Sequence, residues 1–117
     1  MNIIVDSPQL VRVVIQYLNM KFGNLIIKTS SEYLNSIFYV DSDNEVMMEY
    51  DEKKHNIFIK YKEILSKISF LFHLDEDYNA KLIIRQWLEE TYNIRDIKYI
   101  ASNPALDWTF ENAINLD

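Results

Sequence analysis

Four short stretches of the chain alternate apolar and polar side chains with the period of two that is typical of β-strands. Their sequences are NLIIKTS, SIFYVD, EVMMEYD and NIFIKY, and they are rich in β-branched and aromatic residues. Polar turn-forming residues separate them at the close spacing of an antiparallel meander. We therefore expect a three- to four-stranded antiparallel sheet between residues 24 and 61.

Alternation assigns the side chains of this sheet to two faces. Pairing that is symmetric about the turns at Asp43-Asn44 and Lys53-Lys54 keeps both sets of side chains in register. The first face holds Ile37, Tyr39, Val46, Met48, Tyr50, Ile57, Ile59 and Tyr61. The second face holds Phe38, Val40, Met47, Phe58, Glu45, Glu49, Asp51 and Lys60. This second face is more apolar than a solvated face needs to be, so we expect either the C-terminal segment ALDWTFENAINL or a partner to cover it.

Before the sheet, apolar residues repeat at helical spacing. Ser7-Pro8 is typical of an N-cap followed by proline at the first helical position. The only glycine, Gly23, suits a left-handed residue that ends the helix. The predicted apolar stripe between them consists of Leu10, Val13, Val14, Tyr17 and Leu18.

After the sheet, two further helices are predicted. The first has its apolar stripe at Ile64, Leu65, Ile68, Leu71 and Phe72. Asp75 is a suitable N-cap for the second. Its stripe is Leu82 or Ile83, with Ile84, Trp87, Leu88 and Thr91. The stretch IRDIKYIA is compatible with a short additional strand, and Asn103-Pro104 opens a last turn that contains Leu106, Trp108 and Phe110.

These elements predict an α+β fold. It has an N-terminal helix, the β-meander, two helices packed on one sheet face and a short C-terminal element. No repeat or low-complexity linker interrupts the chain of 117 residues. We therefore expect a single α+β domain spanning residues 1–117.

The acidic window DSDNEVMMEYDE, residues 41–52, has the oxygen-ligand spacing of an EF-hand calcium loop. However, Val46 occupies the sixth position, where such a loop needs glycine for its sharp bend. The flanking segments alternate as strands, whereas an EF-hand loop lies between two helices. We therefore predict a hairpin turn with charged residues on its outer side, and no calcium site.

Composition narrows the classes of function. The formal net charge of −6 disfavours sequence-independent binding to nucleic acid, which depends on clustered Lys and Arg. No apolar run approaches the roughly 20 residues that span a bilayer, and the N-terminal residues lack the features of a secretory signal. The absence of cysteine favours a reducing compartment. We expect a cytoplasmic protein of a bacterium, or of a host cell if the source is viral.

No local motif predicts catalysis or a cofactor. One glycine excludes a P-loop and a G-x-G-x-x-G turn. The grouping of His73, Asp75 and Asp77 is too generic to define a metal site, and His55 is expected to be a solvated turn residue. Glu89 and Glu90 are adjacent and would diverge on a helix, so they do not form an acid–base pair. We expect no catalytic residue, cofactor or metal, although a site assembled by tertiary contacts remains an alternative.

These exclusions leave a small acidic interaction protein, from a phage or another mobile element, as the expected function. It would bind a protein partner or a second copy of itself through the outer sheet face. The predicted contact residues are Phe38, Val40, Met47, Phe58, Glu45 and Glu49. The alternative is an acidic inhibitor, either an immunity protein or a nucleic-acid mimic, that binds a basic enzyme surface. That inhibitor would use Asp75, Glu76, Asp77, Glu89 and Glu90.

Overall fold

A computed structural model describes residues 8–29 and 33–102. The predicted cap Ser7 and the C-terminal turn with Leu106, Trp108 and Phe110 lie outside these described residues. The chain divides into two compact units. A helical unit comprises Met1–Gly23 and Tyr61–Arg95, and a sheet unit comprises Asn24–Lys60 and Asp96–Asp117. The α+β class is confirmed, and the expectation of one domain stays a prediction.

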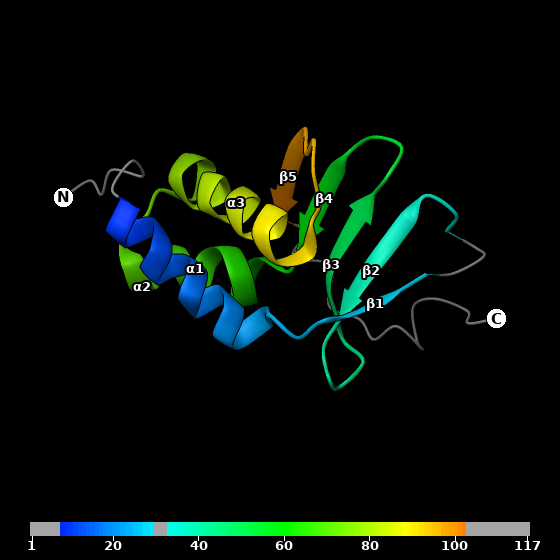
Figure 1. The fold of residues 1–117 in the computed structure, drawn as a ribbon, viewed down its shortest axis with the longest axis horizontal. Helices are drawn as coiled ribbons and strands as arrows, with labels where there is room; N and C mark the ends of the chain where they lie inside the picture. The colour runs from blue at the N-terminus through cyan, green and yellow to red at the C-terminus, as the bar shows by residue number, and fades with distance from the viewer. Residues whose placement is uncertain (1–7, 30–32, 103–117) are drawn as a thin grey trace. The chain divides into compact units, whose positions relative to one another are not determined.

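In the described part of the sheet unit, five strands lie in chain order (Figure 1). They are β1 (Ile26–Lys28), β2 (Ser36–Val40), β3 (Val46–Asp51), β4 (Asn56–Ile59) and β5 (Tyr99–Ser102). The first four strands pair antiparallel, which confirms the meander. The stretch IRDIKYIA does add a strand, β5, which pairs parallel with β4. Strands β1 and β5 therefore form the two edges of the described sheet.

The predicted register is confirmed along most of the meander. Tyr39 lies opposite Met48, and Met48 lies opposite Ile59, as symmetry about the two turns requires. The exception is a β-bulge beside Val40. Symmetric pairing would place Met47 opposite Val40, but the structure places Val46 there. Because cross-strand partners share a face, this pairing moves Val46 from its predicted first face to the second.

The acidic window forms the predicted turn. The carboxylate Oδ1 of Asp41 accepts hydrogen bonds from the backbone N–H groups of Asp43 and Glu45, both at 2.9 Å. Such local bonds are the reason that aspartate initiates turns. Asn44 adopts a left-handed conformation with φ of 64°. The extended strands β2 and β3 flank this turn, so the EF-hand interpretation is wrong on geometric grounds.

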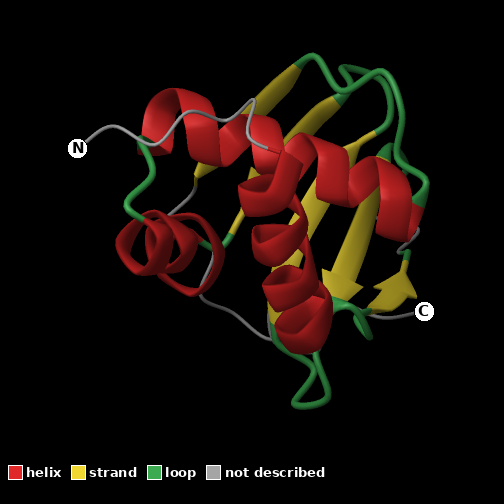
Figure 2. Cartoon of the chain, turned by 60° about the vertical axis from the view of Figure 1, so that its left-hand side comes forward, coloured by secondary structure: helices red, strands yellow, loops and turns green. Residues whose placement is uncertain are grey.

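The helical unit contains α1 (Pro8–Phe22) and two composite helices (Figure 2). Each composite helix begins with a π-helical turn: η1 (Tyr61–Leu65) leads into α2 (Ser66–Phe72), and η2 (Glu76–Ala80) leads into α3 (Lys81–Tyr92). Asp75 acts as predicted, since its Oδ1 accepts a hydrogen bond from the backbone N–H of Tyr78 at 3.0 Å. At the other end of this connection, His73 ends α2 in a left-handed conformation with φ of 56°.

The buried stripes of the helices differ from the predicted ones at single positions. Helix α1 buries Val11, Val14, Ile15 and Leu18, a spacing of three and four residues. Val13 is therefore wrongly predicted, because it lies two positions from Val11, about 200° around the helix, and is 50% exposed. Leu71 of α2 is also largely exposed. For α3 the sequence left Leu82 and Ile83 as alternatives, and the structure buries Ile83.

Gly23 follows the last residue of α1, as predicted, but for a different reason. Its φ is not positive, so it is not a left-handed cap. Its backbone N–H donates to the carbonyl oxygen of Asn19 at 2.9 Å. A Cβ atom at this position would overlap that same carbonyl oxygen. Glycine is needed here because the two backbone segments approach closely.

Helices α1 and α3 are joined by a polar network around Asn19. Its side-chain oxygen accepts hydrogen bonds from Trp87 Nε1 at 2.9 Å and from Thr91 Oγ1 at 2.7 Å. The Tyr92 hydroxyl donates to the backbone oxygen of Phe22. The indole ring of Trp87 makes edge-to-face contacts with Phe22 and Tyr92 and is fully buried.

Among the described residues, no helix combines the length and the apolar character needed to cross a membrane.

Candidate interaction surface

The sheet register brings together the residues predicted to bind a partner. Phe38, Glu49 and Phe58 are successive cross-strand neighbours on β2, β3 and β4. In the next row, Val40 lies opposite the bulge in β3. Met47, in this bulge, is linked to β4 because its carbonyl oxygen accepts a hydrogen bond from the backbone N–H of Lys60 at 2.9 Å. These residues form one continuous area of the second face.

Most of the apolar side chains predicted to contact a partner are buried within the single chain. Phe38, Val40 and Met47 are 1%, 0% and 3% exposed, so the predicted centre of the interface is closed in the single chain. Only Phe58, Glu45 and Glu49 remain half-buried. Part of the closure comes from Tyr33, whose ring meets that of Phe38 edge to face at a centroid distance of 6.0 Å. A partner cannot reach the three buried side chains without displacing whatever covers them.

The carboxylates of this face are engaged within the sheet. Glu45 forms an ion pair with Lys60, a lysine that is only 8% exposed. Burying a lysine is costly unless a carboxylate compensates its charge, so this pairing is required by the position of Lys60. Glu49 accepts a hydrogen bond from Ser36 Oγ at 2.8 Å. The predicted acidic rim is thus largely a set of intramolecular contacts.

An exposed apolar group at the β1 edge was missed by the sequence analysis. Ile26 and Ile27 of β1 are 53% and 56% exposed, and Leu34 is 80% exposed. Tyr33, 43% exposed, lies near the Lys28 end of β1, because it contacts Phe38, whose cross-strand neighbour is Lys28. We call Ile26, Ile27, Tyr33 and Leu34 the β1 rim. Two features of the sequence could have predicted it: the first strand of a meander forms an edge of the sheet, and this strand has apolar residues on both faces.

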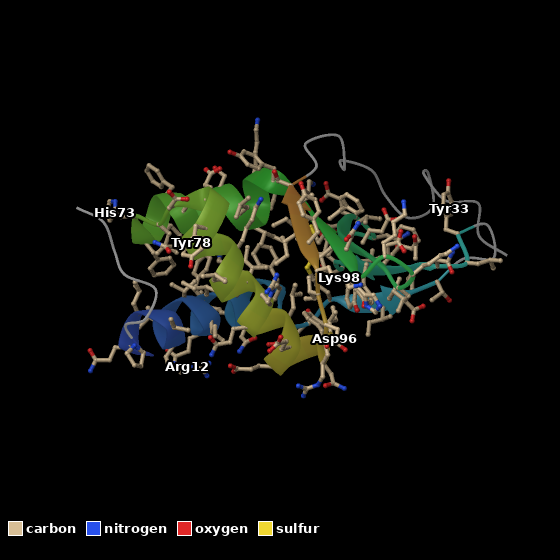
Figure 3. All side chains as sticks on the ribbon, turned by 90° about the horizontal axis from the view of Figure 1, so that it is seen from above. Arg12, Tyr33, His73, Tyr78, Asp96 and Lys98 are labelled. Carbon is tan, nitrogen blue, oxygen red and sulfur yellow. The ribbon has the colours of Figure 1, made fainter. Side chains whose placement is uncertain are left out.

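A cluster of ionisable groups lies at the end of the sheet where the β3–β4 turn meets the residues before β5. The hydroxyl of Tyr50 is hydrogen-bonded to Nδ1 of His55 at 3.0 Å, so His55 is half-buried and not the solvated residue expected. His55 and Asp96 both have left-handed backbones, and the N–H of Lys98 donates to the carbonyl of His55 at 2.8 Å. Figure 3 shows Asp96 and Lys98 close together, with Tyr33 well away from both.

Electrostatics limit what this second cluster can do. Burial raises the pKa of Tyr50, and the negative charges of Glu52, Asp96 and Asp51 raise it further. The phenol therefore stays protonated at neutral pH and cannot act as a base. Within the described residues, no three His, Asp or Glu side chains are arranged to hold a metal ion. The cluster is best described as a hydrogen-bonded end of the sheet.

The residues of the alternative inhibitor surface do not form one patch. Glu76 and Glu89 are thirteen positions apart along η2 and α3, about 20 Å in a helix. Several are also engaged internally. Tyr61 donates to Glu76, and Arg12 forms a salt bridge with Glu90 at 2.6 Å that lowers the pKa of that carboxyl. A basic enzyme surface would have to contact two separate acidic groups.

The β1 rim thus holds the most exposed apolar side chains of the meander. Its side chains offer apolar contact area and one phenol, which suits protein recognition better than chemistry. No protein-family model, curated protein or solved structure matches the chain significantly.

Proposed function

We propose that the protein is a non-enzymatic interaction protein of the cytoplasm that associates with a second copy of itself through the β1 rim. The observation that supports this proposal is that four apolar side chains on the edge strand β1 and in the connection to β2, those of Ile26, Ile27, Tyr33 and Leu34, are all exposed. Contiguous exposed apolar side chains at a sheet edge are a common feature of surfaces that bind other chains.

A second copy is a suitable occupant because an edge of this kind is self-complementary about a two-fold axis. Apolar side chains of one rim would pack on the same side chains of the other. The net charge of −6 on each copy opposes this approach at low ionic strength. Salt screens that repulsion, so self-association should strengthen as salt is added.

The molar mass in solution tests this proposal. We expect light scattering to give a dimer at about 0.5 mM chain. Leu34→Lys should give a monomer, because it places a charge at the most exposed position of the rim. Met20→Lys is the matched control and should still dimerise, since Met20 is 69% exposed on α1 in the helical unit. A wild-type chain that stays monomeric at this concentration in both low and high salt would exclude self-association.

The salt response separates this proposal from the inhibitor alternative. Binding of an acidic protein to a basic enzyme weakens steeply as salt is added, whereas the proposed dimer strengthens.

The metal-dependent enzyme alternative is addressed by elemental analysis of native protein. A stoichiometric metal would contradict the non-enzymatic proposal.

A further inference from the structure

Helix α1 has a second apolar stripe besides the buried one. Leu10, Val13, Tyr17 and Met20 follow one another at spacings of three, four and three residues. This is the a/d spacing of a coiled-coil seam, the narrow stripe on which one partner helix packs. The stripe differs in direction from the buried one, because Met20 lies about 180° around the helix from the buried Val11. We call Leu10, Val13, Tyr17 and Met20 the α1 seam.

The α1 seam is accessible and held in place by α2. Val13 and Met20 are 50% and 69% exposed, and Leu10 and Tyr17 are half-buried. The ring of Tyr17 meets that of Phe72 in α2 edge to face, at a centroid distance of 5.8 Å. The contact with α2 restricts the Tyr17 side chain before any partner arrives, which lowers the entropy cost of binding.

The charges on α1, η1 and α2 have the opposite sign to the chain as a whole. Their cationic side chains are Arg12, Lys21, Lys62 and Lys67, and their one carboxylate is Glu63, in a chain of net charge −6. Glu90 compensates the charge of Arg12. Lys21 is exposed and lies four residues after Tyr17, on the same side of α1 as that ring. The α1 seam is therefore bordered by a cation and by no carboxylate of its own helix.

We propose that the α1 seam binds an acidic amphipathic helix of a partner protein. Apolar side chains of that helix would pack on the seam, and its flanking carboxylates would face Lys21. Ten residues separate Leu10 from Met20, about 15 Å of helix, so two heptads of the partner cover the seam. A second copy of this chain is a poorer occupant, because its own α1 would bring further cations and no carboxylate to this surface.

This inference goes beyond the proposed function. The α1 seam belongs to the helical unit, whereas the β1 rim belongs to the sheet unit. The two surfaces share no residue, so each can be tested without the other.

Synthetic helices are the probe. One peptide of about three heptads has Leu at a and d and Glu at e and g, and a second peptide has Lys in place of Glu. With a fluorophore on each peptide, we expect anisotropy to show saturable binding of the acidic peptide with a Kd on the order of 50 µM. The basic peptide should bind at least about tenfold more weakly. Lys21→Glu should reduce this preference for the acidic peptide.

Val13→Glu tests the position of the site. It places a carboxylate within the seam and should weaken binding of the acidic peptide about tenfold. Phe70→Glu is the matched control and should bind as the wild-type chain does. It adds the same charge at a side chain that is 79% exposed and lies about 200° around α2 from Phe72. Circular dichroism checks the fold of each variant, and the exposed Lys21→Glu decides the matter if Val13→Glu does not fold.

Three results would overturn the inference: no saturable binding of the acidic peptide, equal binding of the two peptides, or equal losses in Val13→Glu and Phe70→Glu. Light scattering tests the other occupant. Val13→Glu should dimerise as the wild-type chain does, and a dimer lost through this substitution would place a second copy on the seam instead. Peptide binding is measured in the Leu34→Lys background, so its failure is distinct from a failure of the β1 rim to dimerise.

Discussion

At the scale of single residues, Asn19 connects two helices through one oxygen atom. Trp87 and Thr91 both donate to it, and the indole of Trp87 is buried, so losing this acceptor leaves an N–H group without a partner. We expect Asn19→Ala to lower the free energy of unfolding by about 1–2 kcal/mol. Asn19→Asp keeps an acceptor oxygen and should cost less. Urea unfolding followed by tryptophan fluorescence measures both, and equal losses in the two variants would contradict the role of the acceptor.

Tyr50 makes stability depend on alkaline pH. Its pKa in the folded state is raised above the ordinary value of 10.0, chiefly by burial and then by Glu52, Asp96 and Asp51. The folded state therefore holds the phenol proton more tightly than the unfolded state, and this contribution is fully present below pH 10. It is lost as the pH rises from about 10 through the folded pKa.

We expect Tyr50→Phe to lose less stability between pH 9 and pH 11 than the wild-type chain, because it has no phenol to ionise there. Tyr17 has a raised pKa for the same main reason, so a residual decline should remain. Tyr78→Phe serves as the control, since Tyr78 is 66% exposed. Urea midpoints across this pH range provide the measurement. Identical pH profiles for Tyr50→Phe and Tyr78→Phe would show that burial of Tyr50 has no energetic consequence.

At the scale of elements, the end of α1 depends on the close approach at Gly23. A side chain there would overlap the Asn19 carbonyl, so Gly23→Ala should destabilise the chain by about 1–3 kcal/mol. Gly23→Asn separates the two explanations for this glycine. Asparagine tolerates a left-handed backbone, but it cannot avoid the steric overlap. Thermal unfolding should therefore show Asn to be as harmful as Ala, and a near-native melting temperature for Asn would favour the left-handed explanation instead.

The elements that sequence predicts well here are those fixed by local pattern. The meander and its register follow from period-two alternation and from turn residues such as Asp43-Asn44. The bulge does not, because Val46, Met47 and Met48 are consecutive apolar residues that fit either face. The pairing of β5 with β4 could not be predicted either, since a short strand gives no indication of a partner that lies about forty residues earlier. The buried stripe of α1 differs from the predicted one because Val11 and Val13 are equally apolar, and only tertiary contacts determine which of them is buried.

At the scale of the whole molecule, the candidate surface was only partly predictable. Alternation correctly grouped Phe38, Glu49 and Phe58 on one face, because the register is a local property. Whether such a face is open or closed depends on which other parts of the chain reach it, and a local pattern contains no such information. The β1 rim has the opposite character. Its exposure follows from the position of β1 at the edge, which the order of strands in a meander implies.

The parallel strand at the end of the sheet also has a consequence for biosynthesis. A ribosome completes β4 about forty residues before β5, which at 5–20 residues per second is a delay of about 2–8 s. During this interval the outer backbone of β4, which includes Ile57 and Ile59, has not yet met its partner strand. Nascent chains on one messenger are then neighbours with open strand edges, the condition under which chains pair with each other and precipitate. Slow translation of the helical segment between β4 and β5 would therefore lower the yield of native protein.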